Sequence, residues 1–302
     1  MTKNIHATEH HFGWDNSIAP KMVVQPGEEV FVETLDSSAG QITKDSKLPD
    51  LINLDFGKVN PVTGPILVQG AKAGDAVQIT FLEFHTKGWG WTGNIPGFGL
   101  LADQFKDPAL HIWKFDASKP TVSEFEAGGK VALKPFVGTI GLALAEKGLH
   151  SVVPPRNVGG NLDIRDMSAG TVLCLPVEVD GALLSIGDTH AAQGDGEVCG
   201  TAIESPIDVL VQIDLIKDAK ISSPQFETSS AVTNHIDKAG YLVTTGVGPD
   251  LMVGAREAVS RMIDLLVKRH KITPMQAYML CSVAGDLRIS EIVDMPNCID
   301  SV

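Results

Sequence analysis

One run of ten residues, Ile207 to Ile216, alternates apolar and other side chains almost without a break. The apolar positions of one face are Ile207, Val209, Val211, Ile213 and Leu215. Because successive side chains of an extended chain point to opposite faces, this period of two predicts a β-strand with one buried face. The run therefore favours a fold built around β-sheets.

Shorter runs of the same character fill the segment from Val23 to Leu144. They are Glu29 to Glu33, Ala76 to Phe84 and Val131 to Phe136, and glycine and proline separate them repeatedly. This spacing is typical of a β-sandwich or barrel. Farther along, Val179-Asp-Gly181 predicts a hairpin, because Asp-Gly readily takes the positive φ values of a tight turn.

The pattern changes period near the C-terminus. Apolar residues recur at steps of three and four from Met252 to Leu266, which predicts an amphipathic helix over Pro249 to His270. Thr273 and Pro274 have the residue types of an N-cap and a first helical position, and they predict a second helix that ends at Val283. Leu287 to Val293 is interpreted as a return to strand.

These patterns together predict an α+β fold that is mainly β. We expect a β-sandwich or barrel-like body with a C-terminal α/β portion carrying two helices. Two domains are expected, a β-rich N-terminal domain over residues 1–145 and a motif-bearing β region with the C-terminal helices over residues 146–302. No linker rich in polar residues separates them, so we expect the two domains to intertwine.

Charge and composition exclude several classes of protein. The formal net charge is -13 and the pI is near 5.0, whereas proteins that bind nucleic acid cluster Lys and Arg. No apolar run approaches the roughly 18 residues of a membrane-spanning helix. The four cysteines show no Cys-x-x-Cys spacing and are expected to be reduced thiols. We therefore expect a cytoplasmic protein that binds neither nucleic acid nor membrane.

The most informative stretch runs from Gly187 to Glu204. In an extended chain Asp188 and His190 share a face with the apolar residues before them, so a carboxylate and an imidazole project side by side. Such a pair is often no more than a satisfied polar contact. The concentration of acidic residues among four glycines, at Asp195, Glu197 and Glu204, favours a metal site instead. Zinc is the first candidate for the divalent metal, and calcium is the second.

A second polar stretch contains Asn161, Asp163 and Arg165, which share a face if the chain is extended there. Two glycines, Gly159 and Gly160, precede them and allow close approach of the backbone to a bound group. Asp163 is a candidate to complete the metal shell. The alternative is a turn with a surface ion pair from Arg165.

A cysteine and a tryptophan followed by a glycine-rich loop are further candidates for the site. Cys199 follows two acidic residues, which raise rather than lower the pKa of a thiol, so a structural role is favoured over a nucleophile. Trp91 and the loop from Asn94 to Leu101 are candidates to wall a small pocket, and core packing is the alternative.

Motifs in order along the chain resemble those of the acetamidase/formamidase family. They are His11-Phe-Gly-Trp14, Thr34-Leu-Asp36 with Gly40-Gln41, Asn60 to Pro65, Gly90-Trp-Thr92 with Ile95 to Leu101, Gly138 to Gly141, Gly159 to Asp163, and Gly187 to Glu197 with Gly200 to Glu204. The last motif is long and unusual in composition. The resemblance implies hydrolysis of short amides such as formamide or acetamide, and a β-rich fold.

The working hypothesis is therefore a metal-dependent amidohydrolase acting on linear amide C–N bonds. In it Asp163, Asp188 and His190 bind the metal, and His190 and Glu197 are catalytic, with Glu197 as the general base. Asn161 and Trp91 are expected to contact the small amide substrate. The alternatives are an amidase with Cys199 as nucleophile and a calcium-binding β-sandwich that binds a ligand without turnover. A homodimer or higher homo-oligomer is expected.

Overall fold

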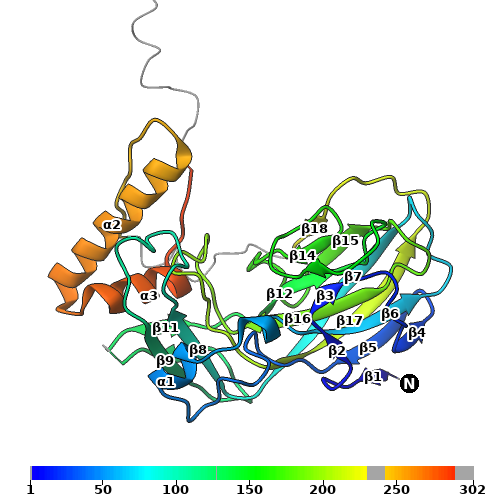
Figure 1. The fold of residues 1–302 in the computed structure, drawn as a ribbon, viewed down its shortest axis with the longest axis horizontal. Coiled ribbons are helices and arrows are strands. Elements are labelled where there is room, and N and C mark those ends of the chain that lie inside the picture. Colours follow the sequence, from blue (N-terminus) through cyan, green and yellow to red (C-terminus); the bar gives the residue numbers. More distant parts are fainter. Residues whose placement is uncertain (1, 127, 230–241, 290–302) are drawn as a thin grey trace, which may run out of the picture.

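The computed structural model describes residues 2–126, 128–229 and 242–289, and within them two β-sheets form a sandwich beside a smaller helical unit (Figure 1). The first sheet has six strands. In spatial order they are β1 (Lys3–Ile5), β5 (Glu28–Val32), β17 (Ile207–Ile216), β7 (Ala76–Thr86), β15 (Val172–Pro176) and β18 (Gln225–Glu227). The predicted strand at Ile207 to Ile216 lies near the centre of this sheet, paired antiparallel with β5 and β7.

The second sheet carries the strand that leads to the candidate site. Its strands in spatial order are β14 (Gly159–Asn161), β12 (Phe136–Gly141), β16 (Leu184–His190), β6 (Val62–Val68) and β2 (His10–His11), while β4 (Met22–Val24) also pairs with β6. β16 lies between β12 and β6 and is antiparallel to both. Its central place explains why all seven of its residues are buried.

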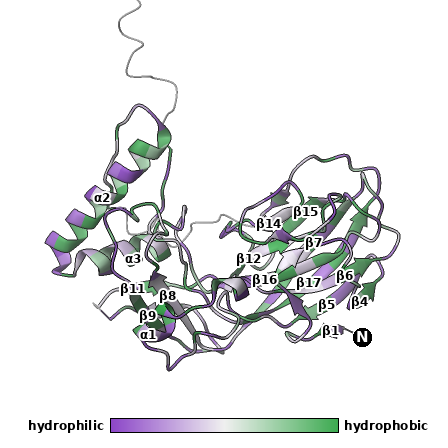
Figure 2. Cartoon of the chain, viewed as in Figure 1, coloured by the Kyte–Doolittle hydropathy of each residue, from purple (hydrophilic) through white to green (hydrophobic). Residues whose placement is uncertain are grey.

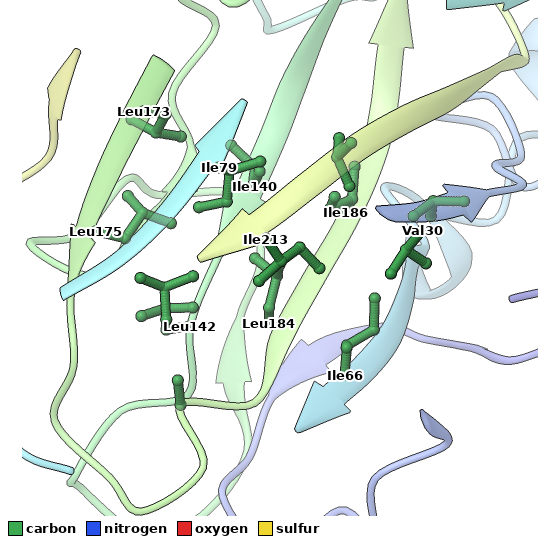
Figure 3. Packing of buried hydrophobic residues seen from close by; sticks show 14 of the residues in the cluster. Val30, Ile66, Ile79, Ile140, Leu142, Leu173, Leu175, Leu184, Ile186 and Ile213 are labelled. Carbon is green, nitrogen blue, oxygen red and sulfur yellow. The ribbon is translucent and has the colours of Figure 1, made fainter. Parts of the chain in front are cut away.

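The two sheets enclose an aliphatic core. Figure 3 shows Ile79 and Ile213 of the first sheet against Ile140 and Ile186 of the second. All four side chains are fully buried. Burying an aliphatic side chain of this size stabilises the fold by about 1.5–3 kcal/mol, so the sandwich needs no covalent cross-link.

A second unit is built from short hairpins and helices (Figure 1). Its strands pair as β8 (Trp89–Asn94) with β9 (Ala109–Lys114) and β10 (Val122–Glu124) with β11 (Lys130–Ala132). A short helix α1 (Leu48–Ile52) and a 3-10 turn (Phe56–Lys58) precede them in the chain, and β3 (Gly13–Trp14) pairs with β13 (His150–Ser151) beside the sandwich.

The two C-terminal helices are α2 (Leu251–His270) and α3 (Pro274–Ala284). The Asp250 side chain caps α2 by accepting from Val253 N, and Thr273 caps α3 by accepting from Gln276 N. Figure 2 shows polar and apolar residues alternating along α2, as expected of a helix with one packed face. Both helices agree with the predicted ones to within two residues at each end.

The second unit has its own core, separate from that of the sandwich. Trp113, Phe125, Ile263 and Tyr278 of α3 belong to it, and the Tyr278 ring stacks on Phe105 with centroids 4.5 Å apart. The Tyr278 hydroxyl accepts from Leu101 N at 2.8 Å and donates to Val198 O. Through these bonds α3 holds the loop that follows β8 and the loop that follows β16.

The predicted α+β, mainly β fold is confirmed, with three corrections to local predictions. The turn at Val179 to Gly181 exists, but it joins β15 of one sheet to β16 of the other, so the predicted hairpin is wrong. Positive φ at Gly181, Ala182 and Leu183 carries the chain across the sandwich instead.

The run Val131 to Phe136 is two strands, β11 and β12, with a break around Pro135, which has no N–H to donate to a ladder. Residues 287–289 are not extended into a strand, and the rest of the strand predicted over Leu287 to Val293 lies outside the described residues.

Both sheets take strands from either side of residue 145, which fits the expectation of intertwined domains. The division into residues 1–145 and 146–302 stays a prediction. In the described residues no helix has the length and apolar character needed to cross a bilayer.

Candidate active site

Strand β16 begins with apolar core residues and ends with an aspartate and a histidine. Leu184 and Ile186 belong to the sandwich core, whereas Asp188 and His190 lie at the C-terminal end of the strand. Asp188 Oδ1 lies 3.1 Å from His190 Nε2. Only 3% of Asp188 and 1% of His190 is exposed, so this pair lies in the interior.

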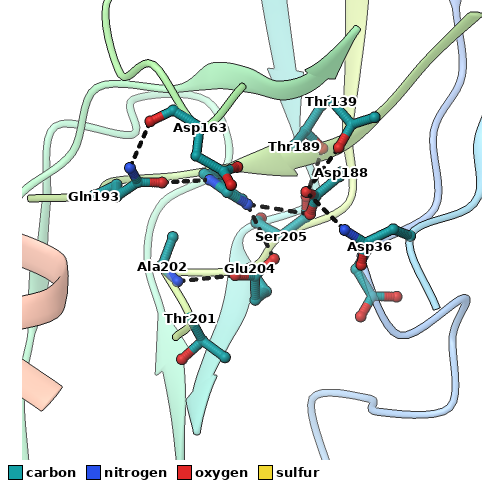
Figure 4. A network of polar contacts seen from close by, with 12 residues as sticks. Asp36, Thr139, Asp163, Asp188, Thr189, Gln193, Thr201, Ala202, Glu204 and Ser205 are labelled. Carbon is teal, nitrogen blue, oxygen red and sulfur yellow. Dashed lines mark hydrogen bonds and ion pairs between the residues drawn. The ribbon is translucent and has the colours of Figure 1, made fainter. Parts of the chain in front are cut away.

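Glu204 reaches the same imidazole nitrogen from another segment. Its Oε2 lies 3.1 Å from His190 Nε2, and its Oε1 accepts from Ala202 N at 2.9 Å (Figure 4). The backbone of Glu204 is fixed by two hydrogen bonds to Trp91, Trp91 N to Glu204 O and Glu204 N to Trp91 O, each 2.8 Å. Strand β8 therefore positions this carboxylate.

Gln193 sets the orientation of the imidazole. Its Nε2 donates to Asp163 O at 2.7 Å, so its Oε1 faces His190 Nδ1 at 3.0 Å and accepts from that ring nitrogen. The other ring nitrogen, Nε2, is thereby directed at Asp188 and Glu204. Burial opposes a charge on the ring, but the charges of Glu204 and Asp188 raise the pKa of His190 well above its usual value.

Asp163 enters from the end of β14. Its N donates to Gly138 O at 3.1 Å, and its Oδ2 accepts from Asn161 Nδ2 at 2.8 Å. Its Oδ1 is buried and accepts no hydrogen bond from any described residue. Burial, followed by the charge of Asp188, raises the pKa of Asp163 to about 8.

Glu197 lies in the glycine-rich loop after β16. One carboxylate oxygen of Glu197, one of Asp163 and one ring nitrogen of His190 lie within 4.8 Å of one another. Burial, followed by the charge of Asp163, raises the pKa of Glu197 well above its usual value. The two acidic stretches that are far apart in the sequence therefore meet at His190.

Asp188 differs from Asp163, Glu197 and Glu204, because its pKa is lowered whereas theirs are raised. Its Oδ2 accepts from Thr139 Oγ1 at 3.0 Å and from Asn60 Nδ2 at 3.2 Å. Burial would raise the pKa of Asp188, but the charge of His190 and the hydrogen bonds with His190, Glu204 and Thr139 together lower it.

We call Asp163, Asp188, His190, Glu197 and Glu204 the carboxylate cluster. Three of its members have left-handed backbone, with φ of 48° at Asp163, 48° at Asp188 and 42° at Glu197. Positive φ outside glycine costs about 1–3 kcal/mol per residue and gathers at functional sites. The fold holds these carboxylates in strained places, which is expected where their placement serves chemistry.

The cluster fits a divalent cation. It contains two groups of three ligand atoms that share His190, one with Asp163 and Glu197 and the other with Asp188 and Glu204. Asp188 and Glu204 are buried and Asp163 and Glu197 are half-buried around one imidazole, and the buried Oδ1 of Asp163 has no donor among the described residues. Nitrogen and oxygen ligands of this kind are typical of catalytic zinc sites.

Gly138 of β12 forms one wall of the cluster. A Cβ at this position would lie 2.7 Å from Asp188 O and 2.8 Å from both Asp163 Oδ1 and His190 Cε1. No side chain fits there without moving the cluster, so the glycine is required by close approach rather than by a turn.

Trp91 and Asn161, the predicted substrate contacts, are both held by protein groups. The Trp91 indole Nε1 donates to Asp36 Oδ2 at 2.8 Å, and the ring is buried. Asn161 Oδ1 accepts from Thr139 Oγ1 at 2.5 Å, and its Nδ2 binds Asp163. Asn161 thus connects Asp163 with Thr139, whose hydroxyl also binds Asp188. Trp91 contacts the cluster through its backbone hydrogen bonds with Glu204.

Cys199 is a buried thiol whose contacts are structural. Its Sγ lies 3.8 Å from Gly93 O and 3.7 Å from Thr201 Oγ1, and burial raises the pKa of the thiol. No basic side chain among the described residues bonds to it. These surroundings are the opposite of those that activate a nucleophilic cysteine.

Sequence reasoning singled out four of the five cluster residues for roles and left Glu204 without one. It also did not assign Thr139, Asn60 or Gln193, whose side chains orient Asp188 and His190. Thr139, Asn60, Gln193 and Glu204 all lie inside motifs of the family resemblance, which is the signal that the sequence offers for them.

Comparison with known proteins identifies the family. A model described as the Acetamidase/Formamidase family matches residues 1–152 and 143–302, which together span the chain. A formamidase from Methylophilus methylotrophus is 27% identical over 354 residues, covering 95% of this chain and 86% of that protein.

Solved structures agree. A γ-lactamase from Delftia acidovorans has a TM-score of 0.88 at 28% identity, covering 95% of this chain and 86% of that one. An acetamidase from Bacillus halodurans has a TM-score of 0.70 at 30% identity, covering 92% and 89%. The chain therefore belongs to the acetamidase/formamidase family, as its sequence motifs predict.

Proposed function

We propose that the protein is a metal-dependent hydrolase that cleaves short-chain primary amides to a carboxylate and ammonia. Family membership and relatives named formamidase and acetamidase support the amide bond as the target. The observation that carries the metal dependence is the meeting of four carboxylates at the single imidazole of His190.

Asp163, Asp188 and His190 are the proposed metal ligands. Asp163 shares its ligand group with His190 and Glu197, whereas Asp188 shares its group with His190 and Glu204, so His190 is the ligand common to both groups. Zinc is the first candidate and calcium the second. When bound, a divalent cation supplies a Lewis acid that polarises the unreactive amide carbonyl and makes water more acidic. Gln193 and Thr139 keep the ligands His190 and Asp188 in their orientations.

Glu197 is the proposed general base. Burial, followed by the charge of Asp163, raises its pKa well above that of an ordinary glutamate, which makes its carboxylate a stronger base. In this role it removes a proton from the attacking water and delivers it to the departing nitrogen. His190 is the second catalytic residue of the proposal, because its Nε2 lies between Asp188 and Glu204.

Burial of the cluster supports a small substrate. Asp188, His190 and Glu204 are each at most 3% exposed, and a short amide needs less displacement of the surrounding residues than a long acyl chain to reach them. Asn161 is proposed to contact the substrate amide, since its own amide borders Asp163. Trp91 is proposed as a wall of the substrate site beside Glu204.

A small cyclic amide is a second candidate substrate. The TM-score to the γ-lactamase is 0.88, against 0.70 for the acetamidase, although the sequence identities are similar. Opening a lactam breaks the same kind of C–N bond, so the same groups would serve both substrates. We therefore pair formamide and acetamide with 2-pyrrolidinone in the test.

The decisive test compares chelator-treated protein with protein reloaded with zinc or calcium, with metal content measured by elemental analysis. Ammonia release from formamide and acetamide is expected only after reloading. If metal-free protein released ammonia as fast as reloaded protein, the metal mechanism would be wrong. Ring opening of 2-pyrrolidinone in preference to the linear amides would select the second substrate.

Two alternatives are separated by the same assays. Cys199→Ser would abolish a thiol mechanism, whereas the metal mechanism predicts activity within about twofold of wild type, because the thiol bonds only to structural groups. A calcium-binding module without catalysis would gain thermal stability with calcium and release no ammonia. A cytoplasmic homodimer or higher oligomer is also proposed, and sedimentation of the purified protein tests its assembly.

A further inference from the structure

A buried guanidinium joins three segments next to the carboxylate cluster. Arg165 Nε lies 3.1 Å from Asp195 Oδ1, and Arg165 Nη1 donates to Asp286 Oδ1. Only 14% of the Arg165 side chain and 10% of the Asp286 side chain is exposed. The Arg165–Asp286 pair is therefore not the surface ion pair that was the alternative for Arg165, whereas the Asp195 side chain is 46% exposed. The guanidinium binds both carboxylates at once.

Arg165 and its partner Asp195 lie close in sequence to the two acidic stretches of the site, and its partner Asp286 lies beside α3. Arg165 lies two residues after Asp163, and Asp195 lies two residues before Glu197. Asp286 follows the C-terminal end of α3. The guanidinium thus connects the segment of Asp163, the loop of Glu197 and the helical unit.

Backbone contacts press the same loop onto α3. Gly194 N donates to Ser282 O at 2.8 Å, and Leu287 N donates to Asp195 O at 3.3 Å. A Cβ on Gly194 would lie 2.0 Å from Gly285 O, so the two backbones touch. The loop of Glu197 therefore rests on the end of α3, with Arg165 tying that contact to the sandwich.

We infer that Arg165 is a positioning residue that sets the separation of Asp163 and Glu197, and that α3 is part of the support of the active site. This inference rests on the proposed function for its effect on catalysis. Asp163 and Glu197 each place a carboxylate oxygen beside His190 from a separate segment, and both have left-handed backbone. Without a tie between their segments, the glycine-rich loop would move Glu197 away from Asp163.

The test uses Arg165→Gln, which removes the charge and one arm of the fork, and Arg165→Lys, which keeps the charge but not the planar fork. Arg261→Gln is the matched control, because Arg261 pairs with Glu257 on the exposed side of α2. A shift of about 1 Å in a catalytic group can cost about 100-fold in rate. We expect Arg165→Gln to lower kcat by 10-fold to about 100-fold with KM within about threefold, and Arg165→Lys to lie between it and wild type.

A second readout does not need activity. In full-length protein, hydrogen exchange of the amides from Gly194 to Gly200 is expected to accelerate at least about tenfold in Arg165→Gln and in Asp286→Asn, but not in Arg261→Gln. Zinc affinity, measured by titration of the metal-free protein, is expected to fall in the same two variants.

The outcomes separate this inference from the proposed function. Unchanged loop exchange and unchanged zinc affinity in both Arg165→Gln and Asp286→Asn would overturn the positioning role, whatever the activity. Faster exchange throughout the sandwich by the same factor would also overturn it, because it would show a general loss of stability. If wild-type protein hydrolysed no amide, the proposed function would fall while the exchange and zinc measurements still decided the role of Arg165.

Discussion

The aliphatic core of the sandwich and the carboxylate cluster both take residues from β16, yet different interactions stabilise them. In β16, Leu184 and Ile186 bury groups that need no partner, whereas Asp188 and His190 bury groups that are costly without one. The core is held by contacts that have no preferred direction. The cluster is held by hydrogen bonds whose geometry is specific, from Thr139, Asn60 and Gln193.

The sandwich core provides stability, and the cluster provides the groups for chemistry. Each buried aliphatic side chain of the sandwich adds to its stability. The cluster concentrates like charges and left-handed backbone, which lowers the free energy of unfolding. Changes in the core should therefore alter stability and spare chemistry, while changes in the cluster should alter chemistry first.

The largest effect is expected for His190→Gln. The change removes the one imidazole shared by both ligand groups and leaves Asp188 and Glu204 facing each other without a cation. Amide hydrolysis should fall by about 10²–10⁴ in kcat/KM, and bound zinc should be lost. Steady-state kinetics and elemental analysis measure both.

The control for this variant is His85→Gln, because His85 is exposed and contacts Glu83 at 3.0 Å. It should leave kcat/KM and zinc content as in wild type. A His190→Gln protein that kept its zinc and its activity would remove His190 from the site.

Ile213→Ala is the complementary change in the sandwich core. Ile213 is fully buried, and truncating such a side chain costs about 2–5 kcal/mol of unfolding free energy, including the cavity that is left. Urea unfolding should show this loss, while kcat/KM at a temperature where the variant is folded stays near wild type. A large fall in kcat would show that the core and the cluster are not independent.

Gly138→Ala tests the border between the two regions. The added methyl group meets Asp188 O, Asp163 Oδ1 and His190 Cε1 at 2.7–2.8 Å, so the cluster must move. We expect a loss of about 1–3 kcal/mol in unfolding free energy together with a clear fall in kcat.

Gly129→Ala is the matched control, since the nearest atoms to its added methyl group are 3.9 Å away. It should alter neither stability nor kinetics measurably. Equal behaviour of the two glycine variants would contradict close packing of Gly138 against the cluster.

Local patterns predicted the sandwich strands and helices well, because their causes are local. The period of two at Ile207 to Ile216 and the cap at Thr273 and Pro274 each act within a few residues. Sheet membership is different, because it depends on contacts between distant segments. The turn at Val179 to Gly181 therefore shows a reversal in the sequence but not which sheet the next strand joins.

The cluster shows the same division. Asp163, Asp188, His190 and Glu197 are recognisable because acidic residues and an imidazole gather among glycines. The position of Glu204 depends on backbone pairing with Trp91, which is more than a hundred residues earlier in the chain. Neither that pairing nor the donation from Asn60 to Asp188 leaves a local trace. Their functional roles stay predictions that the variants above test.

The last expected effect is a dependence of stability on pH, to which the cluster contributes a decline as pH rises. In metal-free protein the pKa of Asp163 is about 8, whereas it is about 3.9 in an unfolded chain. Between these values the unfolded state loses the proton and the folded state keeps it, so stability falls as pH rises, by at most about 1.4 kcal/mol per pH unit for one group. The raised pKa of Glu197 acts in the same direction.

Urea unfolding of chelator-treated protein at pH 5, 6 and 7 should therefore show a stability that declines with pH, and Asp163→Asn should reduce the decline. Zinc replaces these protons when it binds, so its stabilising effect should grow over the same range. Ile213→Ala should shift the whole curve and keep its slope, because the sandwich core has no titrating group at that position. A slope that is absent in wild type, or that survives unchanged in Asp163→Asn, would mean that the burial of these carboxylates does not control the linkage.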